Sequence, residues 1–113
     1  MTTLEILKDA YHLLDDKKHW AKWVKAQTHD GIPVESWDKR AVQWCAIGAL
    51  ERVIGGYGAD MREARLFLTG KAMEMYDNGI VEVNDVLGYR QVRAVYRRAI
   101  RELESPLVRE PPQ

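Results

Sequence analysis

The single cysteine of the chain, Cys45, is the side chain best suited to covalent chemistry. A thiolate becomes an effective nucleophile when a histidine accepts its proton and an amide or carboxylate orients that histidine. The chain supplies these partner types at His12, His19, His29, Asn84 and Asp85. One interpretation is therefore a small Cys-dependent hydrolase or transferase that uses Cys45, a histidine and Asp85.

The expected position of Cys45 argues against this chemistry. We expect a helix over about residues 38–54, capped by Asp38 or Ser36, which places Cys45 about two turns inside it. Cysteine nucleophiles usually gain a low pKa from a helix N-terminus or a neighbouring cation. Free cysteine is also among the most frequently buried residue types. We therefore favour a packing role for Cys45 and lean away from an enzyme.

The pair Asn84-Asp85 has two interpretations. Either side chain suits the N-cap of the last helix, with Gly88 easing the turn, and we favour this structural role. A carboxylate here is alternatively a general base or a ligand-binding group. Arg52 lies two turns beyond Cys45, on nearly the same side of the expected helix, and we expect it to pair with Asp85.

A row of arginines on the last helix is the most directional surface feature. Its members share one helix face and are Arg90, Arg93, Arg97 and Arg101. The apolar residues fall on the opposite side, so we expect these arginines to face solvent. Such a face suits the phosphates of a nucleic acid or an acidic protein surface. The alternatives are a solvated face and pairing with the acidic block in residues 74–85.

Two tryptophans, Trp20 and Trp23, lie among lysines in residues 17–25. They suit either hairpin packing or a contact patch for a protein, a second copy of the chain or a single-stranded nucleic acid. Trp44, by contrast, is expected in the core.

Composition limits the other possibilities. The chain has 113 residues, and its 17 Lys and Arg balance its 17 Asp and Glu. Net charge therefore gives no reason to expect polyanion or membrane binding. The longest apolar run is too short to span a bilayer, and no signal segment begins the chain, so we expect a cytoplasmic protein. One cysteine and scattered histidines favour neither a disulfide nor a metal site, and no cofactor is expected.

Hydrophobic periodicity predicts a mostly α fold. The four main helices are expected at about residues 2–16, 38–54, 60–76 and 84–104. Residues 17–36 fit either a helix or a small hairpin around Asp30-Gly31, and residues 80–83 fit a brief strand or an extended connector. We expect one compact four-helix domain over residues 1–104, with a hairpin or irregular excursion between the first two helices, and a flexible tail over residues 105–113.

The expected second helix also carries small residues on one stripe, at Ala41, Cys45, Gly48 and Ala49. Glycine in a helix interior costs about 1 kcal/mol relative to alanine. Gly48 therefore indicates a close backbone approach, which we assign to the last helix.

Two motifs relate the chain to a known family. Residues 44–50 read W-C-A-I-G-A-L and residues 84–88 read N-D-V-L-G. With Trp44, Cys45, Gly48, Asn84, Asp85 and Gly88 in these positions, the chain resembles a bacterial and phage family of small proteins known only as a domain of unknown function. The resemblance covers about residues 20–101. It implies a shared fold and a bacterial or phage origin, and it implies no activity. We therefore expect a binding or accessory module that acts on a protein or nucleic acid partner.

Overall fold

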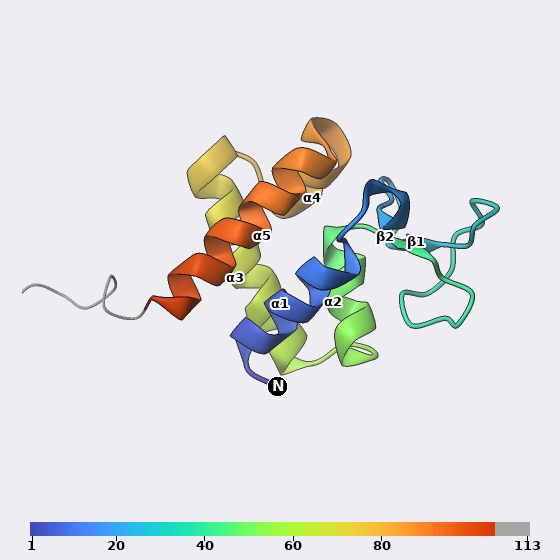
Figure 1. Cartoon of the computed structure of the whole chain (residues 1–113), viewed down its shortest axis with the longest axis horizontal. Helices are drawn as coiled ribbons and strands as arrows, with labels where there is room; N and C mark the ends of the chain where they lie inside the picture. The colour runs from blue at the N-terminus through green and yellow to red at the C-terminus, as the bar shows by residue number, and fades with distance from the viewer. Residues whose placement is uncertain (106–113) are drawn as a thin grey trace, which may run out of the picture.

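The computed structural model describes residues 1–105 and is built mainly from helices (Figure 1). Within these residues the α-helices are α1 (Thr3–Leu13), α2 (Ala46–Ile54), α3 (Ala59–Tyr76), α4 (Ile80–Glu82) and α5 (Tyr89–Glu104). The mostly helical fold class is confirmed. The expected count of four becomes five because a short helix forms at α4, where a strand or connector was predicted.

The ends of the long helices follow local sequence signals. At the start of α1, the Thr2 hydroxyl accepts a hydrogen bond from the Glu5 backbone N–H, and the Glu5 carboxylate accepts one from the Thr2 N–H. α2 ends at Gly55, whose φ of +83° is the left-handed conformation that glycine adopts at little cost. α3 ends at Asp77, also left-handed.

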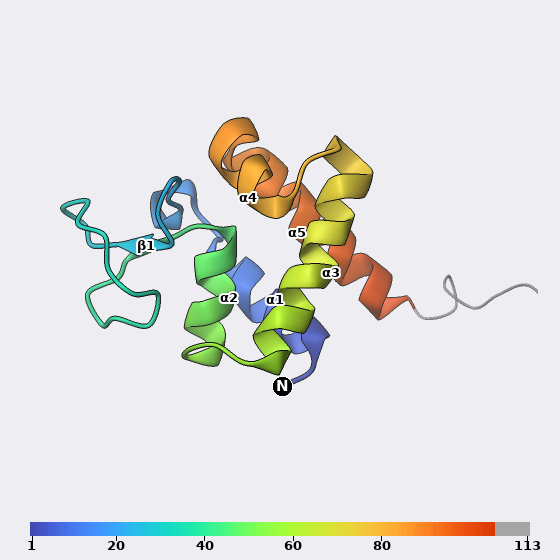
Figure 2. The same ribbon diagram turned by 180° about the vertical axis from the view of Figure 1, so that it is seen from behind.

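One continuous apolar core joins the four longer helices. α1 packs against α2, α3 and α5, and α3 crosses in front of α1 and α5 when the molecule is seen from behind (Figure 2). The largest buried apolar side chains are Ile6, Leu7, Leu14, Leu50, Leu68, Ile80, Val83, Val92, Val95 and Tyr96. The Tyr96 hydroxyl donates to the Ala46 carbonyl at 2.7 Å, which satisfies the one polar atom of this buried ring.

The second helix begins later than predicted. Residues 38–42 form turns, Gln43–Trp44 is a strand (β2), and α2 starts at Ala46. The prediction of a helix from residue 38 was therefore wrong. Ala41 and Cys45 satisfied helical spacing, but the chain there is extended and pairs with Ala26–Gln27 (β1) in an antiparallel two-stranded sheet.

The prediction of a brief strand or extended connector at residues 80–83 was also wrong. Ile80–Glu82 is helical and continues into a π-helical turn, η2 (Val83–Leu87). Ile80 and Val83 point into the core with almost no exposed surface. Burial against the other helices therefore overrides the strand preference of these β-branched residues.

Residues 17–44 leave the helical body as an irregular excursion, on the right in Figure 1. A 3₁₀ turn at Lys17–His19 is followed by β1, and the chain then turns through Gly31, where φ is +82°. The Val34 N–H donates to the Ala26 carbonyl at 3.1 Å, so a small hairpin is present. The prediction of a hairpin or irregular excursion before α2 is confirmed, although β1 forms its two-residue ladder with β2 and only an isolated bridge with Pro33.

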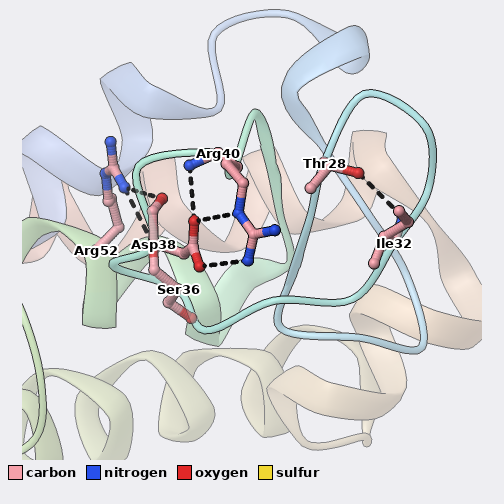
Figure 3. Close-up of polar contacts among 6 residues, drawn as sticks. All are labelled: Thr28, Ile32, Ser36, Asp38, Arg40 and Arg52. Carbon is pink, nitrogen blue, oxygen red and sulfur yellow. Dashed lines mark hydrogen bonds and ion pairs between the residues drawn. The ribbon is translucent and has the colours of Figure 1, made fainter.

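Polar contacts fasten this excursion to α2. The Glu51 carboxylate is almost fully buried and accepts hydrogen bonds from Lys25 Nζ and Ser36 Oγ, both at 2.9 Å. The hydrogen bond to Glu51, together with the negative charge of its carboxylate, raises the pKa of Lys25. Arg52 donates to the backbone carbonyls of Asp38 at 2.8 Å and Ser36 at 3.5 Å (Figure 3). Glu51 and Arg52, two successive residues of α2, thus both bind the excursion.

The loop also carries its own ion pair. Arg40 donates to both carboxylate oxygens of Asp38, at 3.1 and 3.0 Å (Figure 3). These hydrogen bonds lower the pKa of Asp38 to about 2.

Gly48 makes the close backbone approach that its position indicated, but not to the predicted partner. A Cβ atom at residue 48 would overlap the carbonyl oxygen of Lys25. The approaching chain is therefore the entry to β1 rather than α5. The same Lys25 carbonyl accepts a hydrogen bond from the Cys45 N–H at 3.0 Å, which fixes the two segments at this separation.

No helix within residues 1–105 is both long and apolar enough to cross a membrane. The predicted tail over residues 105–113 falls, apart from Ser105, outside the described residues.

Replacing Gly48 with alanine tests the close approach. We expect Gly48→Ala to lower the free energy of unfolding by about 3 kcal/mol, because the new methyl group displaces the Lys25 backbone. Gly70→Ala is the matched control, since a Cβ there meets no atom within 4 Å and alanine favours a helix interior by about 1 kcal/mol. Chemical denaturation at low protein concentration measures both. Equal effects of the two substitutions would contradict the close approach.

Candidate functional site

The centre of the candidate site is the side-chain amide of Asn84, which is 2% exposed. Its Oδ1 accepts hydrogen bonds from Trp20 Nε1 at 2.8 Å and from the Ala46 backbone N–H at 2.9 Å. Its Nδ2 donates to the Ala21 carbonyl at 3.1 Å and to Asp85 Oδ1 at 3.0 Å. All four hydrogen-bonding positions of the amide are thus used. One side chain ties together the excursion, α2 and η2.

This arrangement corrects the predicted cap at Asn84-Asp85. α5 begins after Gly88, and no side chain caps it. Asn84 instead accepts from the first N–H of α2, so it caps a helix that begins 38 residues earlier in the chain. Asn84 therefore caps a helix, as predicted, but the helix is α2 rather than α5.

Asp85, the residue after Asn84, also binds the backbone of the excursion. Its Oδ1 accepts a hydrogen bond from the Trp23 N–H at 2.9 Å. The predicted Arg52–Asp85 pair is absent among residues 1–105, because Arg52 donates to loop carbonyls and stacks over the Trp44 ring at 5.2 Å. Trp44 is buried, as predicted.

Trp23 adopts an unusual conformation. Its φ is +74°, in the left-handed region that bulky residues rarely occupy, and its side chain is 68% exposed. A conformation of this kind costs about 1–3 kcal/mol and persists only when neighbouring contacts impose it. The hydrogen bond from the Trp23 N–H to Asp85 is such a contact. The fold thus presents a large apolar ring to solvent.

Cys45 is the N-cap of α2 rather than an interior residue of a helix. Its sulfur accepts a hydrogen bond from the Gly48 N–H at 3.2 Å. It lines a pocket of about 180 Å³ together with Trp23, Lys25, Arg65 and Asp85. The earlier placement of Cys45 two turns inside a helix was therefore wrong.

Two opposing effects set the acidity of this thiol. Burial raises its pKa, and the N–H groups of Gly48 and Ile47 lower it. The carboxylates of Asp85 and Glu51 add to the raising effect, so the net pKa lies above that of a free cysteine. The helix N-terminus does not produce a reactive thiolate here.

The histidines lie elsewhere. His12 and His19 line a different hollow with Trp44, and His29 is exposed near the turn of the hairpin, beside Asp30. Among the described residues that line the Cys45 pocket, none is a histidine. Cys45 and Asp85 are thus brought together without the base that a Cys-dependent mechanism requires.

The arginine face divides into two parts. Arg90, Arg97 and Arg101 are exposed, as predicted. Arg93 is partly buried, donates to the Leu14 carbonyl and the Tyr11 hydroxyl, each at 2.9 Å, and lies 4.2 Å from the Tyr11 ring centre. The prediction that all four face solvent was therefore wrong at Arg93, which joins α5 to α1.

The fold brings the tryptophan-lysine segment beside the start of α5. A groove of about 360 Å³ is lined mainly by Lys17, Trp20, Lys22, Gly88, Tyr89 and Arg90, and we call it the basic groove. The Trp20 and Tyr89 rings pack with centres 5.8 Å apart. No sequence pattern links these two segments, and helical spacing predicted Tyr89 on the apolar side of its helix. Their meeting depends on the Asn84–Trp20 hydrogen bond, which no local pattern indicates.

The cations of this surface have no acidic partner among the residues that the structure describes. Within residues 1–105, no ion pair involves the exposed side chains of Lys17, Lys22, Arg90, Arg97, Arg98 and Arg101. The acidic residues of 74–85 therefore do not neutralise the arginine face. Glu74 instead pairs with Lys71 at 2.7 Å.

Comparison with known proteins gives one relationship. The model of a family described as "Family of unknown function (DUF6197)" matches residues 1–102. No curated protein matches the chain, and no solved structure matches it.

Alkylation of Cys45 tests its role as a buried cap. At pH 8 we expect iodoacetamide to modify the native thiol about tenfold more slowly than the denatured chain, because the raised pKa reduces the thiolate fraction. The chain has no other cysteine, so mass spectrometry reports this site alone. Since folding raises this pKa, the thiol's contribution to stability is also expected to fall as pH rises above the unfolded pKa. Equal native and denatured rates would contradict the assignment.

Proposed function

The chain belongs to the family of unknown function DUF6197, and we propose that it is a non-enzymatic binding module for single-stranded nucleic acid. The proposed contact surface consists of the basic groove, Trp23 and the exposed arginines of α5. The bacterial or phage origin and the cytoplasmic location expected from the sequence remain part of this proposal. The resemblance to a family of unknown function is confirmed.

The exposed ring of Trp23 carries the proposal. A tryptophan that is 68% exposed, and held in a costly conformation by Asp85, has no packing role that accounts for the cost. Tryptophan is the residue most enriched at binding hot spots, and bases stack on such rings in single strands. Trp23 follows Lys22, which lines the basic groove, directly in the chain, and Trp23 itself lines the Cys45 pocket.

The groove offers phosphate groups several positive partners. Lys17, Lys22 and Arg90 surround the start of α5, and none has an acidic partner within residues 1–105. Gly88 caps this helix without a side chain, so its first N–H groups are also available to an anion. The 16-residue helix adds a favourable dipole at the same end.

The exposed arginines extend the positive surface along α5. At a rise of 1.5 Å per residue, Arg90 and Arg101 are separated by about 16 Å, with Arg97 between them on the same face. This length suits a few nucleotides of backbone. Because the net charge of the chain is zero, the attraction is local and binding should be modest.

The aromatic residues distinguish the proposed ligand from two alternatives. Bases in a duplex are stacked on one another and cannot stack on Trp23, whereas those of a single strand can. An acidic protein would use the arginines but would not need the strained ring. The Cys-dependent enzyme receives less support, because the Cys45 thiol is used as a cap and its pKa is raised.

A tryptophan substitution tests the stacking contact. We expect Trp23→Ala to weaken binding of a fluorescent oligothymidine about tenfold, because stacking contributes roughly 1–3 kcal/mol per base. Trp37→Ala is the matched control: this partly exposed ring of the excursion packs against Tyr57, between α2 and α3, and its loss should leave the affinity unchanged. Anisotropy titration measures both variants. Equal affinities for wild type and Trp23→Ala would contradict the stacking role.

The salt dependence of the same titration tests the electrostatic part. If Lys17, Lys22, Arg90 and Arg97 each contact a phosphate of the single strand, log K should fall against log salt with a slope of about −2.8. Arg97→Gln should reduce the slope by about 0.7. A flat titration, or binding only to acidic proteins, would overturn the nucleic-acid proposal.

A further inference from the structure

The outer face of α3 exposes apolar side chains that the proposed function does not use. Leu66 is 71% exposed and Met73 is 47% exposed, and they lie two turns apart on the same side of the helix. Gly70 lies between them, and a Cβ there would meet no atom within 4 Å. When the molecule is seen from behind, α3 lies in front of α1 and α5 (Figure 2). This face is therefore accessible and allows close approach at its middle.

The residues of this face are arranged symmetrically about its middle. Thr69 and Gly70 are adjacent near the middle of the 18-residue helix, two residues beyond its midpoint. Leu66 lies three residues before Thr69, and Met73 lies three residues after Gly70. Arg62, in the first turn of α3, and Asp77, the left-handed residue that caps its C-terminus, lie four residues farther out, and both are exposed. Apolar residues thus occupy matching inner positions, and opposite charges occupy matching outer positions.

We propose that this face binds a second copy of the chain, with the two α3 helices antiparallel about a twofold axis between Thr69 and Gly70. An isologous contact requires each residue to meet its symmetry counterpart on the partner. Leu66 then meets the partner's Met73, and Arg62 meets the partner's Asp77. Each pair occurs twice. A parallel arrangement would instead place like charges together, so charge complementarity selects the antiparallel dimer.

The close approach at the centre depends on Gly70. Because Gly70 has no side chain, the two helix backbones can come close enough for Leu66 and the partner's Met73 to pack. An 18-residue helix is about 27 Å long, so one helix pair gives an interface near the lower size limit of specific complexes. The dimer should therefore depend on protein concentration.

The residues of the dimer face line neither the basic groove nor the Cys45 pocket that contains Trp23, although Arg65 of α3 lines that pocket. Within residues 1–105, no residue that lines the basic groove belongs to α3. The two proposals can therefore succeed or fail independently.

Sedimentation velocity from low micromolar to millimolar protein tests the dimer. We expect wild type to convert from monomer to dimer over this range and Leu66→Asp to remain monomeric. Val86→Asp is the matched control, because Val86 is also 71% exposed but lies outside α3. It should dimerise like wild type. A wild type that is monomeric throughout, or equal effects of the two substitutions, would overturn the proposal.

Charge exchange tests the antiparallel orientation. Arg62→Asp should weaken self-association about tenfold, because it brings a second negative charge against the partner's Asp77. Asp77→Arg should weaken it similarly for the opposite reason. An equimolar mixture of the two variants should recover association, since every outer pair in the mixed dimer is again oppositely charged. Circular dichroism verifies that each variant is folded, and folded variants that fail to associate when mixed would exclude this arrangement.

Discussion

The amide of Asn84 is the interaction on which the arrangement of this protein depends. It is buried, and it joins its own segment to donors and acceptors from two segments that are far away in the chain. A buried amide is costly unless its hydrogen bonds are satisfied, so these segments must come together for the fold to form. The position of Trp20, the start of α2 and the course of η2 follow from this single requirement.

The W-C-A-I-G-A-L string at residues 44–50 acquires a physical explanation from the same region. Cys45 and Asn84 satisfy the first N–H groups of α2, and Gly48 admits the Lys25 carbonyl. Glu51, one residue beyond the string, binds both Lys25 and Ser36. Residues 44–50 thus form the contact by which the excursion packs against the N-terminus of α2. Its chemistry is hydrogen bonding and packing, while the exposed aromatic and basic groups lie on the surface that this docking creates.

The long helices could be predicted from the sequence because apolar spacing and end signals such as Thr2 and Gly55 act within a few residues. The start of α2 could not, because Ala41 and Cys45 match helical spacing while their backbone is held by strand pairing. The partners of Asn84 lie 38 and more than 60 residues away, beyond any local pattern. For the same reason the sequence indicated the two sides of the basic groove, residues 17–22 and the start of α5, only as separate segments. Arg93 could not be distinguished from its exposed neighbours because its partner, the Leu14 carbonyl, is also distant in the chain.

The most direct test of the central role of Asn84 is amide and indole hydrogen exchange by NMR in Asn84→Ala. We expect the Ala46 amide and the Trp20 indole N–H to lose protection together, because both donate to the deleted oxygen. The Leu68 amide, in the middle of α3, should retain its protection. If Ala46 and Trp20 exchange as slowly in the variant as in wild type, Asn84 does not hold these segments together, and the account is wrong.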